Sequence, residues 1–184
     1  MVRAETRRQR YRRKLGDKIL LPASFTTVCF NFDDNLAFLL RTAACFGFSH
    51  INVIGSIPAR SKIDAKSGSL FDFIEIRQYP NPHAFMEMVR AEKIYLVSAD
   101  LSPSADSLYE YKFKFDIHTS IVIGNETTGI PVEISINSDE VFIPMPGPGY
   151  CLNASQSGTV FAAEYSRQLF MHRPILKKEF SQVI

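Results

Sequence analysis

The sequence predicts one α/β domain in which helices cover both faces of a mostly parallel six-stranded sheet. Two observations lead to this fold class: short apolar, β-prone runs recur along the chain, and segments with helical spacing lie between them. The 184 residues are 46% hydrophobic and 22% charged, which suits a single domain with a substantial core. The expected strands are 26–32, 51–56, 73–79, 93–99, 120–125 and 140–145.

The strand runs and the helical segments are justified separately. Several of the strands are almost continuously hydrophobic, as is typical of strands that are buried on both faces of a parallel sheet. In the first helical segment Leu36, Leu39, Leu40 and Ala43 share one face, and Gly47 follows where a helix C-terminus should end. The expected helices are 35–47, 83–92 and 152–171.

The net charge of +2 conceals a basic N-terminal arm. Residues 1–18 contain eight Lys or Arg and two Asp or Glu, a balance of +6, so the remaining 166 residues carry −4. Such an arm is typical of proteins that dock a polyanion, because each cation that neutralises a phosphate releases counterions. A solvated terminus or a targeting peptide is the alternative, although Glu5 and the scarcity of Ser argue against targeting. We therefore divide the chain into a basic arm, 1–20, and a domain, 21–184.

Cysteine spacing and hydropathy argue against a disulfide-rich, zinc-binding, membrane-spanning or secreted protein. Cys29, Cys45 and Cys151 are widely spaced and form no CxxC pair, so neither a disulfide framework nor a zinc site is supported. No apolar run reaches the roughly 18 residues of a membrane span, and the N-terminus lacks the apolar segment of a secretory signal. We expect a cytoplasmic protein without a bound metal.

Polar residues follow the first expected strand. In an open parallel sheet, ligands usually bind beyond the carboxyl ends of the strands. The stretch NFDDNLAFLLR places Asp34 and Asn35 there, and either residue could instead be an ordinary helix N-cap. Arg41 interrupts the apolar helix face, and a partly buried guanidinium would need an anionic partner.

Two further clusters follow later strands. The stretch IVIGNETTGIP, 121–131, has glycine directly after a strand, where the backbone can approach a ligand, and a carboxylate at Glu126. An ordinary loop is the alternative for this stretch, which matches neither a Walker loop nor GxGxxG. The stretch IPMPGPGYCLNAS, 143–155, is rigid in its Pro and Gly residues and leads into a helix start with free N–H groups.

These three stretches, in this order, resemble the SpoU/TrmH family of SPOUT-class RNA methyltransferases. The quoted stretches are NLAFLLRTAACFG, IVIGNETTGIP and IPMPGPGYCLNAS, and the resemblance covers most of residues 26–170. It implies a deep C-terminal trefoil knot, a homodimer, S-adenosylmethionine as methyl donor and a ribose 2′-hydroxyl of RNA as acceptor. The arm is similar to the basic extension of members that act on tRNA, so tRNA is the first expected substrate and rRNA the second.

The resemblance also assigns residues. It makes Arg41 the central catalytic residue, supported by Asn35, Glu126 and Asn153. The expected cofactor-binding residues are Val97, Ser98, Gly124, Ile143, Met145, Cys151 and Leu152. The expected RNA-binding residues of the arm are Arg7, Arg8, Arg10, Arg12 and Arg13. Cys151 stands where the family usually has Ser, and a thiol is a poorer hydrogen-bond donor than a hydroxyl.

The role of Arg41 and the class of protein each leave an alternative open. Arg41 is the base by family analogy, but a guanidinium keeps its proton, so it can equally clamp a phosphate. The second hypothesis is an RNA-binding module that keeps the fold without activity, for which Cys151 is the best argument. A Rossmann-type methyltransferase or dehydrogenase is disfavoured, because Asp-Asp-Asn follows Phe32 where a glycine-rich turn should be.

Overall fold

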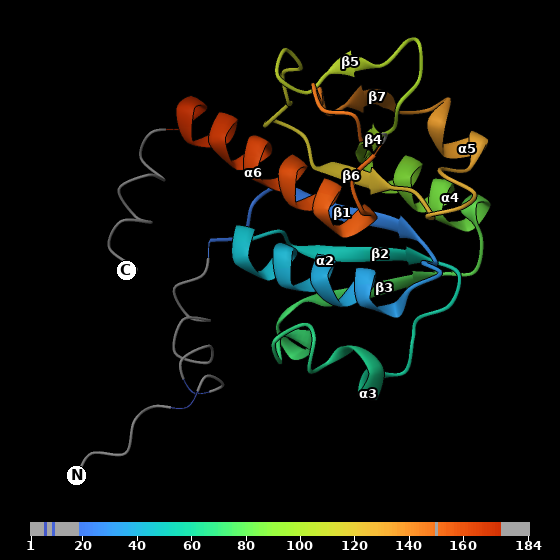
Figure 1. Ribbon diagram of the computed structural model, residues 1–184, viewed down its shortest axis with the longest axis vertical. Helices are drawn as coiled ribbons and strands as arrows, with labels where there is room; N and C mark the ends of the chain where they lie inside the picture. The colour runs from blue at the N-terminus through green and yellow to red at the C-terminus, as the bar shows by residue number, and fades with distance from the viewer. Residues whose placement is uncertain (1–5, 7–8, 10–18, 150, 174–184) are drawn as a thin grey trace.

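The protein forms a parallel α/β sheet of seven strands, described here from a computed structural model (Figure 1). The structure describes residues 6, 9, 19–149 and 151–173. The sheet order is β3-β2-β1-β6-β4-β7-β5, and every paired neighbour is parallel. The strands are β1 (Ala23–Val28), β2 (His50–Ile54), β3 (Glu75–Tyr79), β4 (Tyr95–Ala99), β5 (Asp106–Ser107), β6 (Thr119–Ile123) and β7 (Asp139–Phe142).

All six predicted strands form, but the number six was wrong because β5 is an additional edge strand. β5 has only two residues, which pair with Val141 and Phe142 of β7. It carries no apolar run, so hydrophobic pattern could not indicate it. The first strand also lies earlier than predicted: it covers Ala23–Val28 instead of 26–32. Cys29 still donates its N–H to Ile54, and the chain then leaves the sheet.

Helices cover both faces of the sheet, as predicted. α2 and α6 lie side by side on one face, and α4 and α5 lie on the other (Figure 1). The helices are α2 (Asp33–Phe46), α3 (Arg60–Ile63), α4 (Pro82–Glu92), α5 (Val132–Ser135) and α6 (Ala154–His172), with a 3₁₀ turn at Phe71–Phe73. Within the described residues, no helix is both long enough and apolar enough to cross a membrane.

Some of the helix ends follow local capping chemistry, and others do not. Gly47 ends α2 in the left-handed conformation, φ 72°, as predicted, and its N–H bonds to Ala43. The side chain of Asn81 caps the start of α4. The residue before α2, however, is Phe32, which offers no side-chain cap. The N-cap interpretation of Asp34 and Asn35 was therefore wrong, because both residues lie inside the helix.

Two apolar clusters hold the layers together. Under α2 and α6, Phe25 of β1 stacks on Phe48 with ring centroids 4.5 Å apart, and Tyr165 of α6 meets Phe48 edge-on. On the opposite face, Phe85 of α4 packs in a cluster that includes Leu96 of β4. Because both faces are buried, the sheet can present its polar residues only at its two ends.

A histidine pair marks the amino end of the sheet. His50 of β2 stacks on His118 with ring centroids 5.3 Å apart. Ser49 bonds to His50 at 2.8 Å, and Ser24 bonds to His118 at 3.0 Å. Burial, the nearby Arg77 and His118 lower the pKa of His50 to about 4, although Glu75 opposes them.

Candidate active site

The first and second sequence stretches meet at the carboxyl end of the sheet, because β1 and β6 are neighbours. The carboxylate of Glu126 accepts the Nδ2–H of Asn35 at 2.5 Å and the backbone N–H of Asn31 at 2.8 Å. The N–H of Phe32 adds a longer bond of 3.3 Å to the same carboxylate. Two segments about 90 residues apart in sequence are thus joined through one side chain.

This hydrogen bonding determines the charge of the site. Partial burial alone would raise the pKa of Glu126. Hydrogen bonds from the backbone of Asn31, Glu126 and Phe32 and from the side chain of Asn35 outweigh it and lower the pKa below its usual value. Glu126 is therefore ionised at neutral pH and accepts hydrogen bonds at the edge of the sheet.

The loop that carries Glu126 is shaped by its glycines and by Asn125. Gly129 has φ 69°, and Asn125 forms an antiparallel bridge with it. A Cβ on Gly124 would lie 2.7 Å from the carbonyl carbon of Gly129, so this loop closes too tightly for any side chain there. The Asn125 amide also donates to the carbonyl of Cys29 at 2.7 Å. The loop is therefore attached to the end of β1.

The third stretch leads into α6 through Asn153. The side chain of Asn153 accepts the N–H of Ser155 at 2.9 Å and its hydroxyl at 2.7 Å, so Asn153 is the N-cap of α6. Further along, Thr159 of α6 bonds to Thr42 of α2 at 2.8 Å. Asn153 thus fixes the helix that runs beside α2, and no contact between Asn153 and Glu126 is found among the described residues.

Arg41 is exposed, which corrects the expectation that its guanidinium is partly buried. It lies six residues after Asn35 on α2, which turns it about 120° from Asn35 and places it about 9 Å further along the axis. Phe38, 44% exposed, and Cys45 share its open side of the helix. Among the described residues, the Arg41 guanidinium has no hydrogen-bond or ion-pair partner, so it is available to an anion from outside.

Two of the expected cofactor residues, Gly124 and Ile143, follow the neighbouring strands β6 and β7, which both pair with β4. Ala99 of β4 pairs with Ile123 on one side and with Val141 on the other. Gly124 directly follows Ile123, and Ile143 lies two residues after Val141. Both residues therefore lie at the carboxyl edge of the sheet, on either side of the end of β4. Met145 is half-buried, Leu152 is 36% exposed and Cys151 is exposed, so apolar surface is accessible along this segment.

Val97 and Ser98 lie deeper than the other expected cofactor residues. Both are fully buried inside β4, and β6 and β7 flank this strand. After β4 the edge carries Leu101, which is 65% exposed and which sequence reasoning did not single out. An apolar residue just beyond a buried strand was the available signal for it.

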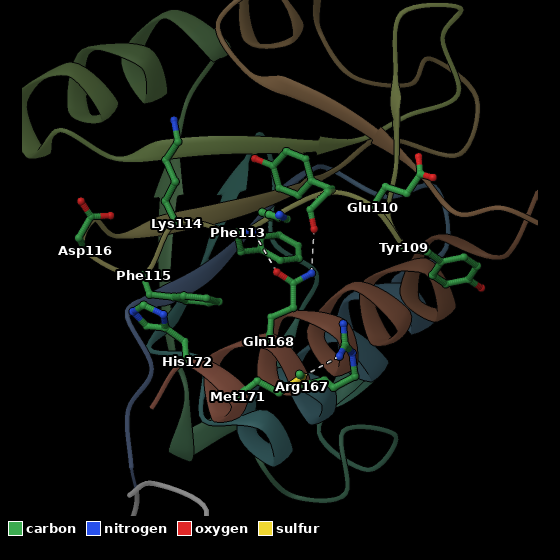
Figure 2. Close-up of a pocket in the computed structure, with 12 residues that line it drawn as sticks. Tyr109, Glu110, Phe113, Lys114, Phe115, Asp116, Arg167, Gln168, Met171 and His172 are labelled. Carbon is green, nitrogen blue, oxygen red and sulfur yellow. Dashed lines mark hydrogen bonds between the residues drawn. The ribbon is translucent and has the colours of Figure 1, made fainter. Parts of the chain in front are cut away.

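Some predicted residues lie outside the site or outside the description. Arg7, Arg8, Arg10, Arg12 and Arg13 fall outside the described residues. Within the described ranges, no group of three or more His, Cys, Asp or Glu side chains could hold a metal ion. A cavity of about 680 Å³ lies elsewhere, between residues 109–116 and the second half of α6, and none of the motif residues lines it (Figure 2).

The fold and the site define a class: an α/β protein with a polar ligand site at the carboxyl ends of parallel strands. The model of the SpoU rRNA Methylase family matches residues 27–163, which is most of the chain. The chain therefore belongs to this family. The match includes Asn35, Arg41, Glu126 and Asn153.

Relatives with a described activity are similar over most of this chain. A 23S rRNA (uridine(2479)-2′-O)-methyltransferase of Streptomyces viridochromogenes is 29% identical over 164 residues, which is 83% of this chain and 56% of that protein. This chain thus spans just over half the length of that relative.

Solved structures agree with the fold. The SpoU methyltransferase AviRb from S. viridochromogenes, in complex with AdoMet, matches with TM-score 0.71 and 25% identity, over 84% of this chain and 58% of AviRb. A structure described as "Structural insights into the 2-OH methylation of C/U34 on tRNA" matches with TM-score 0.70 and 25% identity, over 80% of this chain and 95% of that one.

Proposed function

We propose that this chain is an S-adenosylmethionine-dependent methyltransferase that methylates a ribose 2′-hydroxyl of RNA, with tRNA as the first candidate and rRNA as the second. The observation that carries the proposal is the contact of Asn31 and Asn35 with Glu126 inside the family-matched segment. The rRNA methyltransferase relative, the AdoMet complex of AviRb and the structure concerned with tRNA support the chemistry. The basic arm favours tRNA. A cytoplasmic location is part of the same proposal.

The residues at the carboxyl edge fit S-adenosylmethionine. Ile143, Met145 and Leu152 offer partly exposed apolar surface that can cover an adenine. A Cβ on Gly147 or Gly149 would meet no heavy atom within 4 Å, so the loop there leaves open space. When bound, the sulfonium supplies an activated methyl group. The protein must then hold the acceptor oxygen in line and ease the loss of its proton.

Arg41 is assigned to the RNA phosphate in this proposal. Its guanidinium is exposed, lacks a partner among the described residues and keeps its proton, so it can hold an anion and cannot easily act as a base. Glu126 is ionised and already accepts hydrogen bonds from the loop after β1. Its role is to fix Asn35 and the end of β1 beside the acceptor. Asn153 anchors α6 at the same edge.

The arm, the dimer and the domain boundary belong to the same proposal. Ile19 packs against the core, and the N–H of Leu21 bonds to Gly47, which supports a boundary near residue 20 between arm and domain. A second copy would cover the open side of α2, where Phe38 is 44% exposed beside Arg41. A dimer is thus proposed through the surface of α2 around Phe38.

The test is methyl transfer by the full chain. Purified protein should bind S-adenosylmethionine in calorimetry and transfer a labelled methyl group to tRNA or rRNA from cells that lack the gene. Arg41→Ala should keep cofactor affinity within about twofold and lower turnover by about 100-fold or more, because only the positioning of the acceptor is lost. Arg90→Ala, an exposed arginine on α4, is the matched control and should keep full turnover.

The RNA-binding module without activity remains the second candidate because of Cys151, which is exposed and stands where the family usually has Ser. This candidate would be favoured if the protein binds RNA but calorimetry detects no binding of S-adenosylmethionine. In the same assay, Cys151→Ser restores the hydroxyl usual in the family and should raise turnover if the thiol limits hydrogen bonding in the site.

A further inference from the structure

A groove runs along α6 well away from the candidate active site. It has a volume of about 680 Å³ and lies between residues 109–116 and the part of α6 from Arg167 to His172 (Figure 2). We call it the α6 groove. α6 begins at Asn153 beside the site, so at 1.5 Å per residue the groove lies about 21–28 Å along the same helix. An extended ligand at the site can therefore reach it.

The sequence YEYKFKFD, 109–116, builds one wall of the groove, and burial alternates along it from residue 111 onward. Tyr111 and Phe113 are buried, 8% and 5% exposed, while Lys112 and Lys114, which each follow one of them, are exposed. Gln168 of α6 holds this wall: its side-chain amide donates to the carbonyl of Tyr111 at 2.8 Å and accepts the N–H of Phe113 at 3.1 Å (Figure 2). The backbone on either side of Lys112 is thus fixed against α6.

Aromatic rings are accessible at both ends of the groove. Tyr109 at one end is 64% exposed. At the other end His172 lies against Phe115 with ring centroids 5.3 Å apart. Accessible rings beside exposed lysines are a combination with which proteins hold single-stranded nucleic acid, since bases stack on rings and cations contact the phosphates.

One cation of the groove is available to an anionic ligand among the described residues. The lining carries three Lys or Arg and two Asp or Glu, a balance of +1, whereas residues 19–184 as a whole carry −4. Arg167 is already paired with Glu164 at 2.6 Å, and Lys114 lies over the ring of Tyr95 at 3.7 Å. Lys112 has no partner among the described residues, so it is the cation most available to a phosphate.

We propose that the α6 groove binds an unpaired RNA segment that flanks the methylated nucleotide, with a base stacked on Tyr109 and a phosphate at Lys112. This inference rests on the proposed function and adds a second RNA contact to it. The competing occupant of such a groove is a second copy of this chain, and the experiment separates the two.

The experiment uses the full chain and the RNA, tRNA or rRNA from cells that lack the gene, on which the wild type transfers methyl. Tyr109→Ala and Lys112→Glu change exposed side chains, and melting temperatures within about 2 °C of wild type show that they fold. Tyr109→Ala should weaken RNA affinity by about tenfold, and Tyr109→Phe should restore it, because the ring alone supplies stacking.

Charge reversal is read from salt dependence. Lys112→Glu should weaken RNA affinity about five- to tenfold and reduce the slope of log affinity against log salt by about 0.7, the value for one phosphate contact with a single strand. Arg90→Glu, an exposed reversal on α4 on the opposite face of the sheet, should leave the slope unchanged.

The outcomes separate this inference from the proposed function. If the wild type binds no S-adenosylmethionine and methylates no RNA, the proposed function fails and the inference fails with it. If the wild type is active but both groove variants keep wild-type affinity and slope, only the inference is overturned. Unchanged RNA affinity with a changed mass in sedimentation would assign the groove to a second copy of the chain, which also overturns it.

Discussion

His50 is the residue whose chemistry should dominate the response to acid. Burial first, then Arg77 and His118, lower its pKa to about 4, whereas an unfolded histidine has a pKa near 6.5. Between pH 4 and pH 6.5, His50 is therefore protonated in the unfolded chain but neutral in the folded chain. Stability therefore falls as the pH drops from about 6.5 to 4.

The size of this effect can be measured by urea unfolding at pH 7, 5.5 and 4.5. The difference between the pKa of about 4 in the folded chain and about 6.5 in the unfolded chain corresponds to about 3 kcal/mol of unfolding free energy lost at pH 4. His50→Gln should remove much of the dependence of unfolding free energy on pH, whether or not it changes the stability at pH 7. His83→Gln, at an exposed histidine, should leave the slope as in wild type. An equal slope in His50→Gln would contradict the assignment.

The polar contacts of the site are residue-scale features that the sequence indicated only in part. The sequence singled out Glu126 and Asn35, but it could not show that they bond to each other or that Asn31 shares the carboxylate. Side-chain pairing across 91 residues depends on which strands are neighbours, and hydrophobic periodicity does not encode strand order. For the same reason Arg41 was placed on the correct helix but with the wrong exposure.

At the scale of elements, the turn after α2 depends on Gly47. Its φ is 72°, and a Cβ there would lie 2.4 Å from the carbonyl oxygen of Ile19. Gly47→Ala combines left-handed strain with a backbone clash, so we expect a loss of about 2–4 kcal/mol of unfolding free energy. Urea unfolding at pH 7 measures it.

Gly68 provides the matched control for Gly47. Its φ is 73°, almost the same, but a Cβ there would have no heavy atom within 4 Å. Gly68→Ala should therefore cost only the strain of the conformation, about 1 kcal/mol. Equal losses at the two positions would show that the contact with Ile19 contributes nothing.

The elements themselves were largely predictable. Long periodic segments gave α2, α4 and α6, and continuous apolar runs gave the six strands. The sequence could not give β5, α3 and α5, which have two to four residues each and are too short to show a period. The α6 groove was also missed, because it arises where YEYKFKFD meets a helix that begins almost 40 residues later.

At the scale of the whole molecule, the basic arm should dominate affinity for RNA. Deleting residues 1–14 removes seven cations, so it should weaken RNA binding and flatten its salt dependence. A five-fold variant keeps the length of the arm and should have a similar effect; in it, Gln replaces Arg7, Arg8, Arg10, Arg12 and Arg13. Filter binding at 50 to 300 mM salt measures both. An unchanged slope in the five-fold variant would contradict a role for these charges.

The trefoil knot and the homodimer stay predictions of the family resemblance. The order of the strands shows a central sheet with adjacent β6, β4 and β7, and the family match covers the segment in which a knot would lie. Sedimentation with wild type and Phe38→Glu would test the dimer. Replacing the exposed Phe38 ring with a charged carboxylate should shift the protein toward the monomer if α2 lies in the interface.

The position of β6 has a consequence for how the chain folds. β6 lies between β1 and β4, although both of those strands come earlier in the chain. Until residues 119–123 have left the ribosome, the first three strands and β4 have no hydrogen-bonded strand between them, and Glu126 has not yet met Asn35. Long-range closure of this kind slows folding and leaves apolar strand edges open for a time. The nascent protein therefore becomes competent for ligands only after β6 has joined β1 to β4 and the later segment up to Asn153 has also been synthesised.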